Sequence, residues 1–356
     1  RQMCIRDRGI YQAYVPITIG MFVLMLLQES LSDDADFRKL LRRSLACCGV
    51  LLLGLLLYYV FLKLTLCLYG TQLSDYQGVS SMGKLSLSGI PGLIYEAFYS
   101  ACMLPVKDYC GLAAMKLIKA AYLLIGLFSG VLLVFLLIKR VRKPSIRLFS
   151  LLLCAVFPVA VNFAVIMCPD SWIYTLMVYS LVLISYVPLI LLNQLTEDDR
   201  KRLWLGIVKK GVAIMLSVLA LCYAYQTNVN YTALYYANRQ VENYFSSIVT
   251  QVRMADGFTP DMEWALIGDI EDPLLGCYWE YEMTYGGVEF TQWLLNRYSW
   301  WDWIHNYYGY AIPTASDEKI RVLAQSDAVR AMPCWPADGS IQVVGDTVVI
   351  KCQELP

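Results

Sequence analysis

The chain has 356 residues, of which 58% are hydrophobic and only 16% are charged. Soluble domains carry about 25% charged residues, so this composition excludes an ordinary soluble protein and indicates one embedded in lipid. The formal net charge is zero, but residues 226–356 hold 7 basic against 17 acidic side chains, which argues against nucleic acid as a partner.

Residues 1–8 differ in character from the rest of the chain. Met3-Cys4-Ile5-Arg6-Asp7 can be back-translated into a transposon end used in sequencing libraries, so we expect residues 1–8 to be a sequencing remnant. Gly9 then lies inside an apolar segment with no initiator Met before it. We therefore expect the protein to have a further N-terminal part.

Six apolar segments of about 20 residues come next, each long enough to cross ~30 Å of hydrocarbon as a helix. We expect spans at residues 9–27, 45–69, 117–138, 148–167, 173–192 and 203–225. The last is the weakest, because Lys209 and Lys210 interrupt it.

Basic side chains alternate between the loops that connect these spans. The first, third and fifth loops are rich in Lys and Arg, whereas the longer second loop, 70–116, holds three lysines and no arginine. The positive-inside rule places the basic loops in the cytoplasm. Loop 70–116 and residues 226–356 should then face outward.

Two regions outside the spans have recognisable patterns. Leu85–Leu104 has apolar residues at spacings of three and four, which predicts an amphipathic helix on the outer surface with Pro91 in its first turn. Residues 226–356 predict a small extracytoplasmic α+β domain. Its expected elements are a helix Asn228–Met254, a strand Trp264–Ile267, a helix over 317–330 capped by Ser316, and a hairpin of Ile341–Val344 with Thr347–Lys351.

The 12 cysteines show no metal-binding spacing, and we expect no metal and no cofactor. Half of them lie in apolar segments, where Cys acts as a small hydrophobic residue. Among Cys277, Cys334 and Cys352 one disulfide is conceivable, with Cys334–Cys352 as one pairing and free thiols as the alternative.

Three groups of outward-facing residues fit sugar transfer from a lipid phosphate. Lysines that can bind the phosphate, or instead anchor the chain to anionic lipid, are Lys107, Lys116 and Lys119. Carboxylates that can act as a base, or are simply solvated, are Asp75, Glu96, Asp108 and Asp170. Aromatic residues that can stack on sugars, or instead form a core, include Trp300, Trp301 and Trp303.

The opening Gly9-Ile10-Tyr11-Gln12-Ala13-Tyr14 resembles the membrane glucosyltransferases of the Gtr type II family, which modify bacterial O-antigen and related surface polysaccharides. Met332-Pro333-Cys334-Trp335-Pro336 and Val348-Val349-Ile350-Lys351 resemble their C-terminal end. The resemblance implies a GT-C fold that passes glucose from a polyprenyl-phosphate donor to a polysaccharide or lipid-linked acceptor on the outer face.

The same resemblance bears on the site residues. It implies an essential carboxylate in a first outer loop that would precede Gly9, so we expect the main catalytic residue to be missing and this chain alone to be inactive. Lys351 and Cys334 are the candidates at the C-terminal end, with Lys351 meeting the donor phosphate or acceptor, or else being a solvated strand residue.

Other functions remain open. An outer-face polysaccharide polymerase or ligase is expected to carry arginines that loop 70–116 lacks. A flippase or transporter predicts ionisable residues within the spans, which are scarce. A membrane-anchored binding protein would not need six spans.

Overall fold

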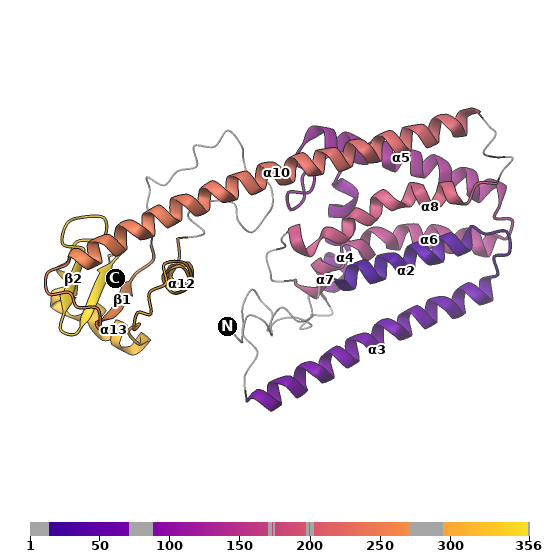
Figure 1. Ribbon diagram of the computed structural model, residues 1–356. Helices are drawn as coiled ribbons and strands as arrows, with labels where there is room; N and C mark the ends of the chain where they lie inside the picture. Colours follow the sequence, from indigo (N-terminus) through magenta and orange to yellow (C-terminus); the bar gives the residue numbers. More distant parts are fainter. Residues whose placement is uncertain are drawn as a thin grey trace. The chain divides into compact units, whose positions relative to one another are not determined.

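The computed structural model describes residues 14–70, 88–169, 173, 175–196, 199, 203–270 and 295–354. They divide into two compact units, and the boundary falls between Gln226 and Thr227, inside helix α10 (Leu203–Met254). We call the first the membrane unit and the second the C-terminal domain, and describe each by itself (Figure 1).

The membrane unit is helical, as its composition predicts. Its elements before α10 are α2 (Tyr14–Ser30), α3 (Phe37–Tyr69), α4 (Ile90–Met103), α5 (Lys116–Lys139), α6 (Pro144–Val161), α7 (Ala164–Met167), the 3-10 helices η2 (Thr175–Met177) and η3 (Tyr179–Tyr186), and α8 (Val187–Asn193). Among the described residues, α3, α5, α6 and α10 are long and apolar enough to cross a membrane, and α2 and the stretch Tyr179–Asn193 are shorter apolar helices. The chain is therefore a polytopic helical membrane protein.

Two expected spans differ from the helices that are observed. Hydropathy predicts one helix over 148–167, but α6 ends at Val161 because Asn162 leaves the helical conformation and bonds elsewhere. Within the expected span 173–192, η2 and η3 are 3-10 helices, and α8 follows at Val187 with a proline in its first turn. The helix predicted over Leu85–Leu104 is observed as the shorter α4, with Pro91 in its first turn, and residues 85–87 lie outside the described residues.

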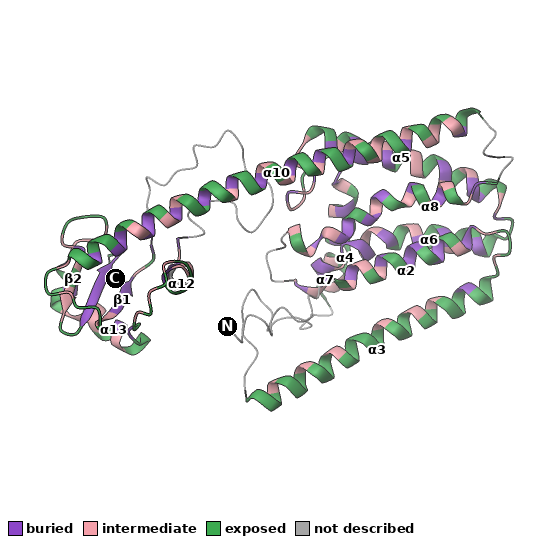
Figure 2. Cartoon of the chain, in the orientation of Figure 1, coloured by how far each residue is buried: buried purple, intermediate pink, exposed green. Residues whose placement is uncertain are grey.

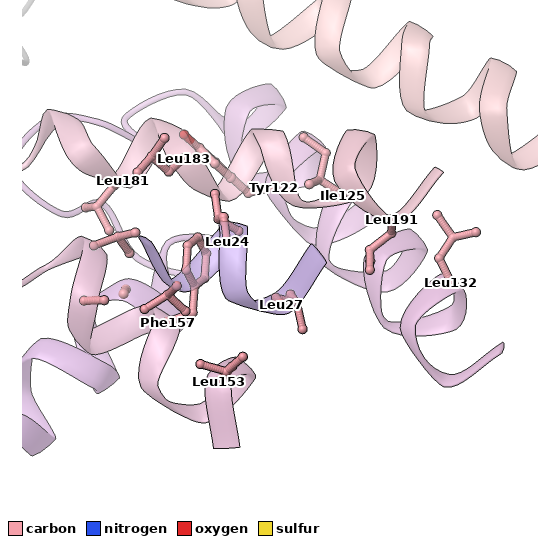
Figure 3. Close-up of a cluster of buried hydrophobic side chains, with 14 of the residues drawn as sticks. Leu24, Leu27, Tyr122, Ile125, Leu132, Leu153, Phe157, Leu181, Leu183 and Leu191 are labelled. Carbon is pink, nitrogen blue, oxygen red and sulfur yellow. The ribbon is translucent and has the colours of Figure 1, made fainter. Parts of the chain in front are cut away.

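The core of the membrane unit forms where α2 packs against α6 and η3. Figure 3 shows buried side chains from five elements meeting there: Leu24, Leu27, Tyr122, Ile125, Leu132, Leu153, Phe157, Leu181, Leu183 and Leu191. Gly20 lets α2 approach closely, since a Cβ atom there would lie 2.7 Å from Leu183 Cδ1 and 2.9 Å from Val161 Cγ1. By contrast, Figure 2 shows α3 exposed along its length, with Leu40 as the buried residue on it.

Ion pairs connect the basic loops at one end of the membrane unit. Arg140 Nη2 lies 3.6 Å from Asp33 Oδ2, which joins the α5–α6 connection to the α2–α3 connection. Lys139 pairs with Asp199, which joins α5 to the connection before α10. The three basic loops therefore share one end of the unit, which we call the basic end (Figure 1).

The C-terminal domain has a three-stranded sheet in the order β1–β3–β2. The central strand β3 (Thr347–Lys351) pairs in parallel with β1 (Glu263–Ile267) and antiparallel with β2 (Ile341–Val344). Both the predicted strand and the predicted hairpin are confirmed. The helix expected over 317–330 is instead two helices, α13 (Asp317–Gln325) and α14 (Asp327–Arg330), because the Ser326 side chain caps the second.

Helices cover both faces of this sheet. Alternate residues of a strand point to opposite faces, so Val348 and Ile350 pack with α10, α12 (Arg297–Asp302) and the π-helical turn η4 (Trp303–Tyr307). Val349 packs on the other face with α13 and α14. Every residue of β3 is consequently buried.

Candidate functional site

The expected phosphate-binding lysines lie around the segment that joins α4 to α5, residues 104–115, which we call the connector. Helix α5 has 24 residues, which span about 36 Å, and its last residue Lys139 belongs to the basic end. Its first residue, Lys116, and the connector before it therefore lie at the opposite end of the membrane unit (Figure 1).

Polar side chains from three later segments hold the connector in place. Asn162, which is fully buried, donates from Nδ2 to the Ala97 carbonyl of α4 (3.1 Å) and accepts from the Tyr109 hydroxyl (3.4 Å). Gln226 Nε2 donates to the Gly111 carbonyl (2.5 Å), and Thr175 Oγ1 donates to the Cys110 carbonyl. Segments that lie far apart in the sequence thus converge on the connector and on α4.

These contacts stabilise a tight backbone bend. Cys110 and Gly111 both have positive φ, 52° and 75°, and Cys110 adopts this left-handed conformation although it carries a side chain. The Cys110 thiol donates to the Ile173 carbonyl (3.2 Å), and Asp108 Oδ1 accepts from the Ala113 amide (2.7 Å). The surrounding bonds offset the strain, and the connector is a built structure rather than a loose loop.

Burial decides which connector groups are reactive. Burial, followed by the charge of Asp108, raises the pKa of Cys110 to about 12, so at neutral pH almost all of this residue is the neutral thiol. Burial first, and then the Cys110 and Glu96 charges, also raise the pKa of Tyr109. Both groups therefore stay neutral, and the ionised groups of this end are the exposed ones.

The exposed groups are the cations and carboxylates that the sequence singled out. Lys107 Nζ lies 5.8 Å from the centroid of the Tyr99 ring, which stacks on Tyr95 at 5.8 Å. Lys116 is exposed and Lys119 half-buried, one turn apart on α5. The carboxylates Glu96, on α4, and Asp108, in the connector, are exposed at the same end.

Two lysines in the first turn of α5 are unfavourable by themselves, because the helix macrodipole is positive there. The residue before α5, Met115, offers no side-chain acceptor to the first amides of the helix. A bound anion would relieve both conditions, since it would meet the amides, the dipole and the two ammonium groups together. This end can therefore hold a phosphate.

Two of the four candidate carboxylates, Asp75 and Asp170, lie outside the described residues. The sequence did not single out Asn162, Thr175 or Gln226. The sequence could have indicated Asn162 and Gln226, because a polar amide within or next to an apolar span must find a buried partner.

The structure corrects both roles expected for Lys351. It is buried at 1% exposure, and its ammonium group donates to the carbonyls of Arg330 (3.1 Å) and Met332 (2.6 Å) and to Glu354 (3.0 Å). All three N–H donors are used, so none is left for a donor phosphate. Neither the phosphate contact nor a solvated ammonium describes it.

The three tryptophans proposed to stack on sugars differ in burial. Trp300 is fully buried against Phe245 and Trp264, so it cannot stack on a sugar. Trp303 is half-buried and packs on that core. Trp301 is also half-buried on that core and stacks on His305 at 6.0 Å, so Trp301 and Trp303 both remain candidates for sugar contact. Cys334 is half-buried beside Glu354.

Comparison with known proteins gives the family. A family model described as glucosyl transferase GtrII matches residues 8–185, half of the chain. The chain belongs to the GtrII glucosyl transferase family. No curated protein and no solved structure matches it.

The GtrII match contains the connector, Asn162 and Lys107, Lys116 and Lys119, whereas α10 and the C-terminal domain come after it. Membership implies a membrane-embedded glycosyltransferase with a sugar donor and an acceptor. Within the described residues there is no cluster of three or more His, Cys, Asp or Glu side chains that could hold a metal ion.

Proposed function

We propose that this GtrII protein transfers glucose from a polyprenyl-phosphate donor to a surface polysaccharide or lipid-linked acceptor, in a GT-C type fold, on the outer face of a bacterial cell membrane. One observation carries this proposal. The lysines Lys107, Lys116 and Lys119 lie within the family match, at the end of the membrane unit opposite the basic end.

Charge supports the sidedness. The basic connections meet at one end through the pairs Arg140–Asp33 and Lys139–Asp199, and the positive-inside rule assigns such an end to the cytoplasm. The connector then faces the extracytoplasmic leaflet, where a polyprenyl-phosphate sugar can present its headgroup. Helix α10 starts at Leu203 on the cytoplasmic side, so one crossing would bring residues after Tyr225 outside.

The chemistry that fits is a single displacement at the sugar. An acceptor hydroxyl forms a bond to C1 of glucose, the bond from C1 to the phosphate oxygen breaks, and a carboxylate takes the hydroxyl proton. The polyprenyl phosphate leaves with an added negative charge, which the ammonium groups of Lys116 and Lys119 stabilise. Glu96 and Asp108 are the candidates for the base among the described residues.

Donor binding tests the proposal without requiring turnover. Affinity of the chain for labelled polyprenyl-phosphate glucose is measured in nanodiscs of neutral lipid. Because each cation contributes about 1 kcal/mol toward a surface anion, Lys116→Ala with Lys119→Ala is expected to weaken binding about 30-fold. The matched control is Lys143→Ala, an exposed lysine before α6 at the basic end.

The result separates a donor site from simple lipid anchoring. Anchoring predicts that the double variant loses affinity for anionic vesicles while its affinity for the glucose donor in neutral nanodiscs is unchanged. That outcome, or an equal loss in Lys143→Ala, would overturn the proposed donor site.

A further inference from the structure

Two thiols of the C-terminal domain flank a single main-chain hydrogen bond. The Trp335 amide, directly after Cys334, donates to the carbonyl of Lys351, directly before Cys352, at 2.7 Å. Each cysteine Cα is one peptide unit away from the bonded atom, so standard backbone geometry keeps the two Cα atoms within about 8 Å of each other. Disulfides join Cα atoms about 4.4–6.8 Å apart.

Further bonds hold the two segments together. The buried ammonium of Lys351 donates to the carbonyls of Arg330 and Met332, in the segment that leads to Cys334. The Cys352 amide donates to the Ile267 carbonyl of β1 at 2.8 Å, which continues the sheet past β3. The backbones on both sides are therefore fixed before any bond forms between the sulfur atoms.

The two thiols also lie close enough to interact electrostatically. Burial, then the charges of Cys334 and Asp269, raise the pKa of Cys352 to about 12. Cys334 is half-buried whereas Cys352 is buried, and both are free thiols in the structure. An oxidant from solution would therefore reach Cys334 first.

We propose that Cys334 and Cys352 are a disulfide-forming pair that joins the segment after α14 to the end of β3. The Cys334 thiolate attacks a sulfur of an oxidising disulfide, a small molecule or a protein, and displaces one of its thiolates. The Cys352 thiol then loses its proton, and its sulfur attacks Cys334 Sγ and displaces the other thiolate of the oxidant. Two protons leave the cysteines and two electrons pass to the oxidant, which ends as two thiols.

This pairing is independent of glucosyl transfer. The bond would close a loop from 334 to 352 that contains the β2–β3 hairpin, and closing a loop of this size restricts the unfolded chain. The oxidised domain is therefore expected to resist denaturant better than the reduced one. A bond of this kind suits a domain on the outer side of the membrane.

Peptide mapping tests the pair directly. Trypsin cuts after Arg330 and Lys351, so the two cysteines fall on separate peptides, Ala331–Lys351 and Cys352–Pro356. The purified full chain is treated with oxidised glutathione, blocked with a maleimide and digested. We expect these two peptides to be joined, to separate on reduction, and to form faster in the folded chain than in urea.

Variants supply the controls. Cys334→Ser and Cys352→Ser each abolish the joined peptide and the gain in denaturation midpoint, whereas Cys102→Ser, at an exposed thiol on α4, retains both. The proposal is overturned if wild-type Cys334 carries glutathione while Cys352 is blocked by maleimide. It is equally overturned if urea-unfolded chain joins the peptides as fast as folded chain.

Discussion

The ammonium group of Lys351 lies inside the C-terminal domain and donates to the Arg330 and Met332 carbonyls. Lys351→Met keeps most of the side-chain volume but leaves both carbonyls buried without this donor. We expect the free energy of unfolding of the domain to fall by about 2 kcal/mol. Denaturant titration followed by tryptophan fluorescence measures it.

Lys319 is the matched control for this change. It lies on the surface of the same domain and pairs with Glu263 and Asp346, each at 2.8 Å, so Lys319→Met should have a much smaller effect. If Lys351→Met kept full stability and instead reduced donor affinity, the structural role assigned to Lys351 would be wrong.

Asn162 allows a second test at the scale of single residues. Its bond to the Ala97 carbonyl is short and buried, whereas the contact from Tyr109 is long at 3.4 Å. Asn162→Ala should therefore destabilise the membrane unit by about 1–3 kcal/mol, and Tyr109→Phe by much less. Thermal unfolding in detergent compares the two, and similar losses would show that the Tyr109 contact is the important one.

For single residues, the sequence showed which side chains can bind a phosphate or a sugar, but not which of them are buried. Lys351 ends a predicted hairpin strand, where it was expected to meet a phosphate or to be solvated, but β3 is the central strand with helices on both faces. The prediction for Trp300 is wrong for the same reason. Burial depends on which elements pack on a strand or helix, and local pattern does not contain that information.

At the scale of elements, Gly20 is where helix packing is tightest. A side chain there would meet Leu183 of η3 and Val161 of α6 within 3 Å. We expect Gly20→Leu to destabilise the membrane unit by about 1–3 kcal/mol through overpacking. The fraction of folded chain that survives heating in detergent measures the effect.

Gly54 on α3 provides the control, since a Cβ atom there has nothing within 4 Å. Gly54→Leu brings the same gain in helix propensity without a clash, so it should not destabilise the chain. Equal losses in the two variants would show that α2 does not need its close approach to η3 and α6.

Hydropathy predicted α3, α5 and the first half of α10 but failed at two breaks. Asn162 ends α6 because its side chain bonds Ala97, more than 60 positions earlier in the chain. The η3 segment stays in 3-10 conformation while Ser180 Oγ donates to the Val161 carbonyl (2.6 Å). Both breaks depend on contacts between distant segments, which a window of 20 residues cannot register.

For the whole molecule, sidedness is the prediction on which the proposed function depends. Lys107→Cys and Lys143→Cys place a thiol at the connector end and at the basic end, respectively. In intact cells a membrane-impermeant maleimide should label position 107 and not position 143, and permeabilised cells should show both. Labelling of position 143 alone in intact cells would invert the orientation and remove the proposed outer site.

Alternating charge in the sequence predicted which loops would share an end. The structure agrees, because Asp33 and Asp199 pair with basic residues of the loop between them. The polar groups that shape the connector were not foreseen, because each comes from a different segment and its bonding partner lies far away in the sequence. Loop charge is repeated across many residues, whereas the connector depends on single side chains.

The bond between Gln226 and the Gly111 carbonyl spans 115 positions of sequence. During translation the connector is therefore synthesised long before Gln226, whose side-chain amide holds it in place. Throughout that interval the lysine-bearing end stays incomplete, and it closes only when the final apolar helix has entered the bilayer. The connector therefore reaches its final hydrogen-bonded form only after translation has passed residue 226.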